Sequence, residues 1–448
     1  METAKAGALH IIQTLSDAGH RALLAGGCVR DMAMGKEPKD WDVATDAGPE
    51  EVLRLFPRTV PVGEKFGIVV VVLEDGEYEV ARFRRDGRYL DGRHPEEVQF
   101  AGAEQDARRR DFTINGMFFD PLEERIIDYV GGRDDIERGL VRAIGDPRRR
   151  FGEDYLRLLR AVRFAARLGF EIEGETRRAI EEEAGNIAQI SAERIRDELT
   201  KILTEGHAAE GMQILLETGL LRQVLPEVVD MDGVPQPPQF HPEGDVWTHV
   251  KMLLEALEEP SATLAWGALL HDIGKPPTFE VEDRIRFNKH DMVGAKMAEK
   301  VCRRLHMSNE DTEKIGTLTA QHMRFRNVKD MRESKLKRFL RQPHFAELLE
   351  LHRLDCLASH GALDLYEFCR EKMEMAESDP QELKPPRLLS GHDLIAMGFE
   401  PGVLFKEILT ALEDEQLEGR ISNLEEAMAF VRERYGTVLT APGAENKS

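Results

Sequence analysis

The sequence predicts an α/β head followed by an almost entirely helical remainder, and two observations support this expectation. Before Gly145-Asp146-Pro147, short apolar runs rich in β-branched residues alternate with short helical segments, which is typical of a small mixed sheet with helices. After this point, apolar residues such as Leu156, Leu159 and Val162 recur at helical spacing. We therefore expect nearly all of the strands in the head, and helices in the neck, body and tail.

The order of these runs predicts the individual elements. In the head we expect strands over residues 22–26, 40–44, 67–73 and 78–84, and helices over 29–34 and 49–56. The run 67–73 has the composition of a buried strand, and the turn residues 74–77 join it to the next strand as a hairpin. The Pro-rich stretches 234–238 and 384–387 predict breaks between helices.

Composition bounds the class of protein. At about 150 residues per domain, the 448 residues correspond to roughly three domains. Hydrophobic residues at 41% and charged residues at 32% describe a globular chain with ample core. No run approaches the ~18 apolar residues of a membrane span, so we expect no membrane partner. The first residues lack the pattern of a signal peptide and the four cysteines lack C-x-x-C spacing, so we expect a cytoplasmic protein with reduced thiols.

The charge distribution does not exclude a nucleic-acid partner, although the net charge is −22. Between Arg142 and Phe170, eight arginines face three acidic residues, which is a local balance of +5. Binding depends on where charges lie rather than on their sum. A local cluster of arginines on an otherwise acidic protein can therefore bind RNA or a triphosphate.

Two motifs in the head suggest phosphate and metal chemistry. Gly26-Gly27 lies between a strand and a helix, where glycines allow backbone N–H groups to approach an anion; a tight turn is the alternative. Asp40 and Asp42 are two residues apart, so on a strand they would share one face and repel each other without a cation. With Glu79 from a later strand they could hold two Mg²⁺ ions. A solvated strand edge is the alternative for the acidic pair.

The order of several motifs resembles the class II tRNA nucleotidyltransferase and bacterial poly(A) polymerase family, from about residue 22 to 205. The motifs are GGCVRD, DWD, YEV, RRRDFTIN, DYVGGRDDIERG and EDYLRLLRAVRFAARLGF. This resemblance implies a head of the polymerase β type that adds nucleotides to an RNA 3′ end. It also implies that Asp128 and Gly131-Gly132 form the hinge between the head and the neck.

The resemblance implies roles for the head residues as well. Asp40 and Asp42 would bind the catalytic metals, with Glu79 as the third carboxylate. Gly26, Gly27 and Arg30 would bind the triphosphate, and the ribose would be contacted by Arg110, Asp111 and Asn115. For Asp111, a helix N-cap ahead of an apolar run is a second interpretation, and the two are compatible.

In the neck, spacings of three predict that Asp154, Arg157 and Arg160 lie along one stripe of a helix. An ordinary ion-pair stripe is one interpretation. However, a carboxylate only accepts hydrogen bonds and a guanidinium only donates them, so an Asp–Arg pair suits cytosine and adenine and leaves groups unpaired with uracil or guanine. The resemblance implies this template role, with Glu153 orienting Arg157 and Arg160 in support. We interpret residues 193–198 as helix packing and ion pairing.

Two further segments bear on the type of family member. Residues 82–100 resemble the flexible loop of CCA-adding members. Residues 61–67 occupy the position at which poly(A) polymerases carry a basic tract, and they do not form such a tract. Both features favour a tRNA CCA-adding enzyme, and an A-adding enzyme stays open.

The C-terminal half carries a second set of metal-ligand residue types. A His-Asp pair ends an apolar helix within HDIGKP, and further histidines and an aspartate follow in order. Neutral imidazoles and carboxylates suit a divalent metal. The set resembles the HD phosphohydrolase family, which implies His249, His271, Asp272 and Asp355 as core ligands. His290 and His322 would serve a second metal or bind phosphate. Metal-activated water attacking a phosphoester is the implied chemistry; mere support of tRNA is the alternative. The later pair His392-Asp393 follows a serine and predicts a helix start.

These expectations combine into one hypothesis. The head would span residues 1–145, the helical neck and RNA-binding region 146–230, the HD domain 240–360 and a helical tail 361–448. The protein would add C, C and A to tRNA from CTP and ATP with Mg²⁺ in the head, and a divalent metal of unspecified identity would lie in the HD domain. The alternatives are an A-adding enzyme, a poly(A) polymerase, or an HD phosphohydrolase with an RNA-binding head.

Overall fold

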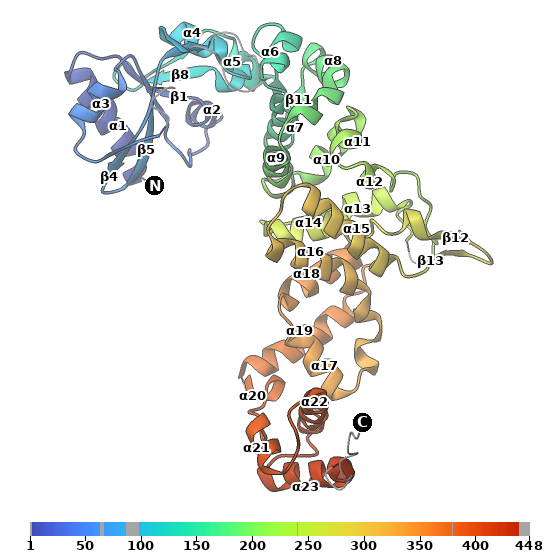
Figure 1. Ribbon diagram of the computed structural model, residues 1–448. Helices are drawn as coiled ribbons and strands as arrows, with labels where there is room; N and C mark the ends of the chain where they lie inside the picture. The colour runs from blue at the N-terminus through green and yellow to red at the C-terminus, as the bar shows by residue number, and fades with distance from the viewer. Residues whose placement is uncertain (1, 63–66, 87–97, 240, 379, 439–448) are drawn as a thin grey trace, which may run out of the picture. The chain divides into compact units, whose positions relative to one another are not determined.

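The computed structural model describes residues 2–62, 67–86, 98–239, 241–378 and 380–438, and they form two compact units (Figure 1). The first unit comprises residues 1–232, 257–266 and 300–308; the second comprises 233–256, 267–299 and 309–448. The boundary after Asp232 falls just before the Pro-rich stretch 234–238, which breaks the helices as predicted. The division into four domains stays a prediction.

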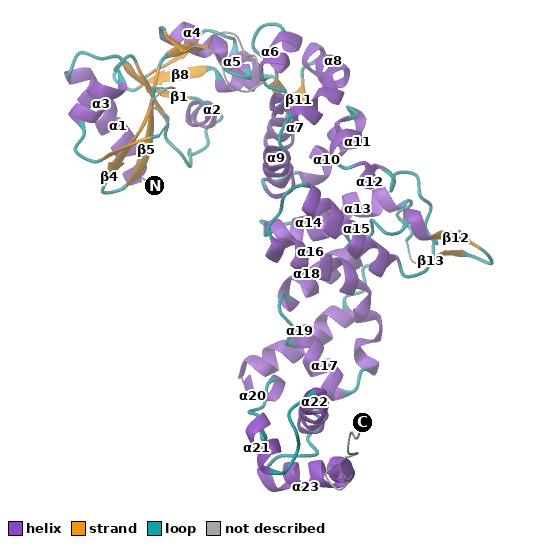
Figure 2. Cartoon of the chain, viewed as in Figure 1, coloured by secondary structure: helices purple, strands orange, loops and turns teal. Residues whose placement is uncertain are grey.

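The first unit begins with the α/β head (Figure 2). Its elements are α1 (Glu2–Asp17), β1 (Ala22–Ala25), α2 (Gly27–Ala33), β2 (Val43–Thr45), α3 (Pro49–Leu55), β3 (Thr59–Pro61), β4 (Ile68–Leu73), β5 (Gly76–Arg82), β6 (Arg84–Asp86), β7 (Val98–Phe100), α4 (Ala103–Arg109), η2 (Thr113–Asn115), β8 (Met117–Asp120), β9 (Arg125–Asp128) and α5 (Gly132–Glu137). The seven-stranded sheet has the order β3-β4-β5-β2-β1-β8-β9. Within it β2 and β5 pair in parallel and the other described pairs are antiparallel, which confirms the mixed sheet.

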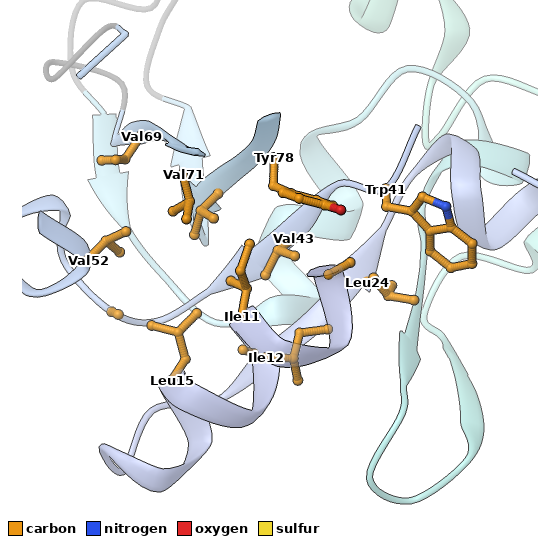
Figure 3. Close-up of a cluster of buried hydrophobic side chains, with 14 of the residues drawn as sticks. Ile11, Ile12, Leu15, Leu24, Trp41, Val43, Val52, Val69, Val71 and Tyr78 are labelled. Carbon is orange, nitrogen blue, oxygen red and sulfur yellow. The ribbon is translucent and has the colours of Figure 1, made fainter. Parts of the chain in front are cut away.

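The head core lies between α1 and one face of this sheet (Figure 3). Ile11, Ile12 and Leu15 of α1 are fully buried against strand residues that include Val69 and Val71. Each such side chain contributes roughly 1.5–3 kcal/mol when buried. The core therefore fixes the strands whose ends carry the acidic motif.

The neck is helical as predicted. Its elements are the short strands β10 (Leu140–Val141) and β11 (Glu171–Ile172) and the helices α6 (Pro147–Glu153), α7 (Leu156–Leu168), α8 (Gly174–Glu183), η3 (Ala184–Gln189), α9 (Ala192–Thr204), α10 (Ala208–Glu217), α11 (Leu220–Val224) and α12 (Pro226–Val229). The segment 257–266 belongs with this unit because Nε1 of Trp266 donates a hydrogen bond to Oγ1 of Thr200 on α9 at 2.9 Å.

The remaining elements are α13 (Val246–Glu255), α14 (Ala262–Leu270), η4 (Pro276–Thr278), β12 (Phe279–Val281), β13 (Ile285–Phe287), α15 (His290–Arg304), α16 (Asn309–Gln321), η5 (His322–Asp330), α17 (Glu333–Leu340), α18 (Phe345–Ala358), α19 (Asp364–Ser378), α20 (Pro380–Leu383), α21 (Gly391–Ala396), α22 (Val403–Leu417), α23 (Leu424–Tyr435) and η6 (Gly436–Val438). A capping box at Ser390 and Asp393 starts α21, which confirms the predicted helix start there. None of the described helices has the length and apolar character needed to cross a membrane.

The structure corrects two predictions in the head. The strand expected over 40–44 is only Val43–Thr45, so Asp40 and Asp42 precede it instead of lying on it. The run 68–73 alternates between buried and half-buried positions and is not a fully buried strand, because only one sheet face is covered there by α1 and α3. The predicted hairpin of β4 and β5 is confirmed. Within the two segments that bear on the type of family member, 61–67 and 82–100, residues 63–66 and 87–97 lie outside the described residues.

Candidate active site and metal centre

Trp41 orients the acidic motif of the head. Its side chain is 7% exposed and packs in the core beside Leu24 and Val43 (Figure 3). The backbone oxygen of Asp42 accepts a hydrogen bond from the Ala25 N–H at 3.0 Å, so the chain is already extended before β2 begins. With Trp41 turned inward, Asp40 and Asp42 turn outward and are exposed.

Glu79 lies beside Asp42 because of the strand register. β2 and β5 run in parallel with Val43 opposite Val80. Asp42 and Glu79 each precede these buried partners by one residue and so point to the opposite face. Partial withdrawal from water and repulsion by Glu79 raise the pKa of the Asp42 carboxyl to about 6, with Arg110 opposing and Asp40 adding to the shift. The cluster is thus short of positive charge, which fits the binding of a divalent cation.

Gly26 and Arg110 lie close to each other, and Arg110 lies near Asp42. Gly26 has a φ of 74°, and a Cβ at this position would lie 2.9 Å from Nη1 of Arg110, so only glycine fits here without strain. Nη2 of Arg110 donates to Asp106 at 3.0 Å and Nη1 donates to the carbonyl oxygen of Asn115 at 3.2 Å. These bonds hold the guanidinium close enough to Asp42 to oppose the rise of its pKa.

Arg30 is placed differently from the predicted triphosphate contact. It is 3% exposed, and its guanidinium donates to Asp31 at 2.7 Å and to Oδ1 of Asn115 at 2.9 Å. In this arrangement it ties α2 to η2. A role of Arg30 and Gly27 toward triphosphate stays a prediction.

Asp111 links the head to the neck. Its Oδ2 accepts two hydrogen bonds from Arg160 on α7, at 2.8 and 2.5 Å. Burial alone would raise the pKa of Asp111, but Arg160 lowers it to about 2. Nδ2 of Asn115 donates to the other carboxylate oxygen at 3.3 Å. The alternative of a helix cap is wrong, since Phe112 holds the cap position of η2 and no side chain caps it.

The two neck residues predicted as a base template, Asp154 and Arg157, are each held by an ion pair. Oε2 of Glu153 accepts from Nη1 of Arg157 at 2.6 Å, as predicted. Asp154 does not continue the helical stripe of Arg157 and Arg160, because α6 ends at Glu153 and α7 begins at Leu156. Instead, Nη2 of Arg194 on α9 donates to Asp154 at 2.7 Å. The acceptor and the donor are therefore each fixed by an oppositely charged partner.

In the second unit, five segments bring the predicted HD residues together. His249 lies on α13, His271-Asp272 follows α14, His290 starts α15, His322 starts η5, and Asp355 lies on α18. Gly274 allows this approach, since a Cβ there would lie 2.1 Å from the backbone oxygen of His290. His249, His271 and Asp272 are 0%, 1% and 2% exposed.

The donor atoms of this cluster fit a divalent metal. Two groups, His249–His271–Asp355 and Asp272–His290–His322, each place ligand atoms within 4.8 Å of one another, and a third is His241–Glu243–His249. Nδ1 of His271, His290 and His322 each lies within 2.9 Å of a backbone carbonyl oxygen, which leaves Nε2 as the ligand atom. Among the described residues, the head acids are not in such a group.

Several buried atoms at the centre have no hydrogen-bond partner in the described part of the chain: Nε2 of His249 and His271, and Oδ1 of Asp272. Nε2 of His249 lies 3.1 Å from Oδ1 of Asp355, but without hydrogen-bond geometry. Although burial would lower the pKa of His249, Asp355 and Glu243 raise it to about 9. A buried cluster that favours positive charge and keeps unpaired acceptors fits a bound cation.

Sequence reasoning missed four residues around these sites. Arg194 lies 40 residues from Asp154 in the chain, and ion pairing of residues 193–198 was expected without a partner. Glu243 contacts His249, and Nζ of Lys275 lies 2.6 Å from both Oδ2 of Asp272 and Oε1 of Gln236. Lys275 could have been found from its place in the HDIGKP stretch; Glu243 and Gln236 carry no spacing signal of their own.

The chain matches three family models. They are described as the poly A polymerase head domain (residues 22–142), the probable RNA and SrmB-binding site of polymerase A (residues 169–231) and the HD domain (residues 245–358). The three matched ranges contain the head acids, Arg194, and the HD cluster respectively.

Curated proteins and a solved structure agree with these models. A CCA-adding enzyme of Bacillus pumilus is 40% identical over 268 residues, which cover 60% of this chain and 63% of that protein. A CCA-adding enzyme of Geobacillus thermodenitrificans is 47% identical over 214 residues, covering 48% of this chain and 53% of that protein. The matches thus span less than two thirds of these relatives.

The crystal structure of Bacillus stearothermophilus CCA-adding enzyme in complex with CTP superposes with a TM-score of 0.73 at 29% identity, and covers 96% of this chain and 97% of that chain. With its head, its RNA-binding region and its HD domain, the chain belongs to the class II tRNA nucleotidyltransferase and bacterial poly(A) polymerase family.

Proposed function

We propose that this protein is a CCA tRNA nucleotidyltransferase, which adds C, C and A to the 3′ end of tRNA from CTP and ATP. The observation that carries the proposal is the pair of neck contacts that fix Asp154 and Arg157, in a chain whose matched relatives are named CCA-adding enzymes. In the proposed reaction the tRNA 3′-hydroxyl attacks the α-phosphate of the nucleotide, and pyrophosphate leaves.

In the head, Asp40 and Asp42 would hold Mg²⁺, with Glu79 next to them. When bound, this ion neutralises phosphate charge and lowers the barrier to attack by a hydroxyl. Arg110, fixed by Asp106, would offer its remaining positive charge to the triphosphate above the Gly26 turn. Asp111 and Asn115 would contact the ribose, and the Arg160 ion pair keeps Asp111 in place during turnover.

In the neck, Asp154 would accept from the exocyclic amino group of cytosine or adenine, and Arg157 would donate to the neighbouring ring nitrogen. A base with the opposite order would leave a buried donor and a buried acceptor unpaired, at a cost of about 1–3 kcal/mol for each group. Because Glu153 and Arg194 hold the two side chains before any base binds, little rotamer entropy would be lost on recognition.

The test is incubation of the full chain with Mg²⁺ and a tRNA that lacks its CCA end, with CTP and ATP supplied separately and together. Three added nucleotides that require both substrates would establish CCA addition. A long adenosine ladder would indicate a poly(A) polymerase, and addition only to a tRNA ending in CC would indicate an A-adding enzyme. No addition would contradict the proposal and favour the HD phosphohydrolase alternative.

We propose a second activity for the HD domain, metal-dependent phosphoester hydrolysis. The unpaired Nε2 atoms of His249 and His271 and Oδ1 of Asp272 support it. A divalent metal held there would activate a water for attack on phosphorus. Lys275, 2.6 Å from Asp272, orients that carboxylate. Hydrolysis of a generic phosphodiester, measured by release of its alcohol with and without added Mn²⁺, Co²⁺ or Ni²⁺, tests this activity, and no metal-dependent release would contradict it.

A further inference from the structure

Glu243 is a buried carboxylate to which the reactions proposed above give no role. It lies in the loop before α13, and its side chain is 4% exposed. Its Oε1 accepts hydrogen bonds from Nδ1 of His249 and from Nδ1 of His241, both at 2.8 Å. Its Oε2 is buried and has no hydrogen-bond partner in the described part of the chain. The carboxylate thus spans two histidines, one of which is fully buried in the metal centre.

This contact distinguishes His249 from the other histidines of the centre. His271, His290 and His322 each present Nδ1 to a neutral backbone carbonyl three residues earlier, on Ala268, Phe287 and Thr319. His249 alone among the four presents Nδ1 to an ionisable side chain. A carboxylate is a stronger acceptor than a carbonyl, so it makes the opposite ring nitrogen a more basic ligand.

The geometry also decides between a positioning role and a separate ion at Glu243. An ion between His241, Glu243 and His249 would need a lone pair on Nδ1 of His249. A metal in the proposed group His249–His271–Asp355 would already take the lone pair of Nε2, which lies 3.1 Å from Oδ1 of Asp355 and has no hydrogen-bond partner among the described residues. A neutral imidazole has one donor nitrogen and one acceptor nitrogen, so it cannot supply both lone pairs. The two hydrogen bonds to one oxygen are therefore the consistent arrangement.

We propose that Glu243 is a positioning residue of the HD metal centre. It holds His249 with the proton on Nδ1 and Nε2 free, and it strengthens the group His249–His271–Asp355 relative to the group Asp272–His290–His322. The inference rests on the proposed HD metal centre and is independent of nucleotide addition.

The test is a Co²⁺ titration of the metal-free full chain, followed by visible absorption and by metal content. The background carries Asp42→Asn, so that ions at the head acids do not contribute. Three variants are compared: Glu243→Gln, which keeps size and an acceptor oxygen; Glu243→Ala; and His241→Asn, the matched control that leaves the Glu243–His249 bond in place. The unfolding midpoint of each metal-free chain is measured alongside.

We expect Glu243→Gln to weaken one class of Co²⁺ site about 10-fold and Glu243→Ala about 100-fold, while the second class and His241→Asn change less than about 3-fold. Unchanged affinity, with only a lower unfolding midpoint of the metal-free chain, would overturn the positioning role. Loss of a whole equivalent of Co²⁺ in Glu243→Gln would instead make Glu243 a ligand and also overturn it. If His271→Ala left the Co²⁺ affinity of the full chain unchanged, the metal centre itself would be refuted, and this inference with it.

Discussion

The head and the HD domain both gather acidic side chains, but in contrasting surroundings. Asp42 and Glu79 are exposed and belong to no close ligand group among the described residues. His249, His271 and Asp272 are at most 2% exposed and lie close together. Mg²⁺ in nucleotide-processing sites is commonly completed by substrate phosphates and water. With metals bound as proposed, the head would leave coordination positions to its substrate, whereas the HD domain would supply a nearly complete set by itself.

The two clusters also differ in which of their groups has a shifted pKa. In the head, partial withdrawal from water and repulsion by Glu79 raise the pKa of Asp42 to about 6. In the HD domain, burial would lower the pKa of His249, but without a metal the carboxylates of Asp355 and Glu243 raise it to about 9. Both clusters carry excess negative charge. In the head this disfavours the charged form of Asp42, and in the HD domain it favours the charged form of His249.

The largest effect is expected from Asp42→Asn. This substitution removes a charged ligand while keeping size, so nucleotide addition to tRNA should fall by about 10³-fold or more. Incorporation of labelled CTP measures it. Glu77→Gln, on the same strand and face as Glu79, should leave the rate unchanged. If Asp42→Asn kept near-normal incorporation, the acids of the head would not form the active site and the comparison would fail.

His271→Ala tests the other side of the comparison. Removing a ligand from the nearly complete buried set should abolish binding of one metal equivalent, since no substrate group is available to replace it. Metal content after dialysis is the measurement, and CCA addition should be unaffected. The exposed His392→Ala serves as control. Loss of nucleotide addition together with the metal would mean that the two clusters are not separate in function.

Arg157→Ala sharpens the comparison, because ion pairs hold the proposed base template of the neck in place, much as packing holds the buried HD residues. Without the guanidinium, the discrimination of CTP and ATP over UTP and GTP should fall about 10- to 100-fold, the cost of one unpaired buried group. Single-nucleotide competition on tRNA ending in CC or lacking CCA measures this. Arg178→Ala, an exposed arginine on α8, should not change base choice. Unchanged discrimination in Arg157→Ala would reduce Asp154 and Arg157 to a structural ion-pair network.

The smallest effect concerns stability and pH. Arg160 lowers the pKa of Asp111 to about 2, below its usual value near 4. The pair therefore stabilises the fold above about pH 4, and the contribution is lost as the pH falls toward 2. Asp111→Asn should lower the free energy of unfolding by about 2 kcal/mol at pH 7, and the gap to wild type should close below pH 3.

Urea unfolding of the full chain at several pH values gives this difference. The matched control is Glu182→Gln, which breaks an exposed pair with Arg148 and should lower the free energy of unfolding far less than Asp111→Asn does, because solvent screens the pair. A gap between Asp111→Asn and wild type that widens as the pH falls would contradict the sign of the shift. It would also remove the argument that the link between head and neck is a preformed ion pair.

Local features were readable from residue order because they depend on neighbours in the chain. The alternation of Trp41 with Asp40 and Asp42, the glycine turn at Gly26, and the His271 pair at the end of an apolar helix each follow from spacing and period. The hairpin of β4 and β5 follows from its turn residues in the same way. Other local predictions were wrong: β2 begins only at Val43, β4 is not fully buried, Phe112 instead of Asp111 holds the cap position of η2, and Asp154 precedes α7.

Long-range partners were decided by tertiary packing. Arg194 reaches Asp154 from 40 residues away and Arg160 reaches Asp111 from 49. A charged side chain has many oppositely charged candidates in a chain with 61 basic and 83 acidic residues, and neither spacing nor periodicity selects among them. Burial makes the choice, because only a partner within hydrogen-bond distance offsets the cost of removing a charge from water. For the same reason Glu243 becomes visible as a partner of His249 only when the helices of the HD domain are folded.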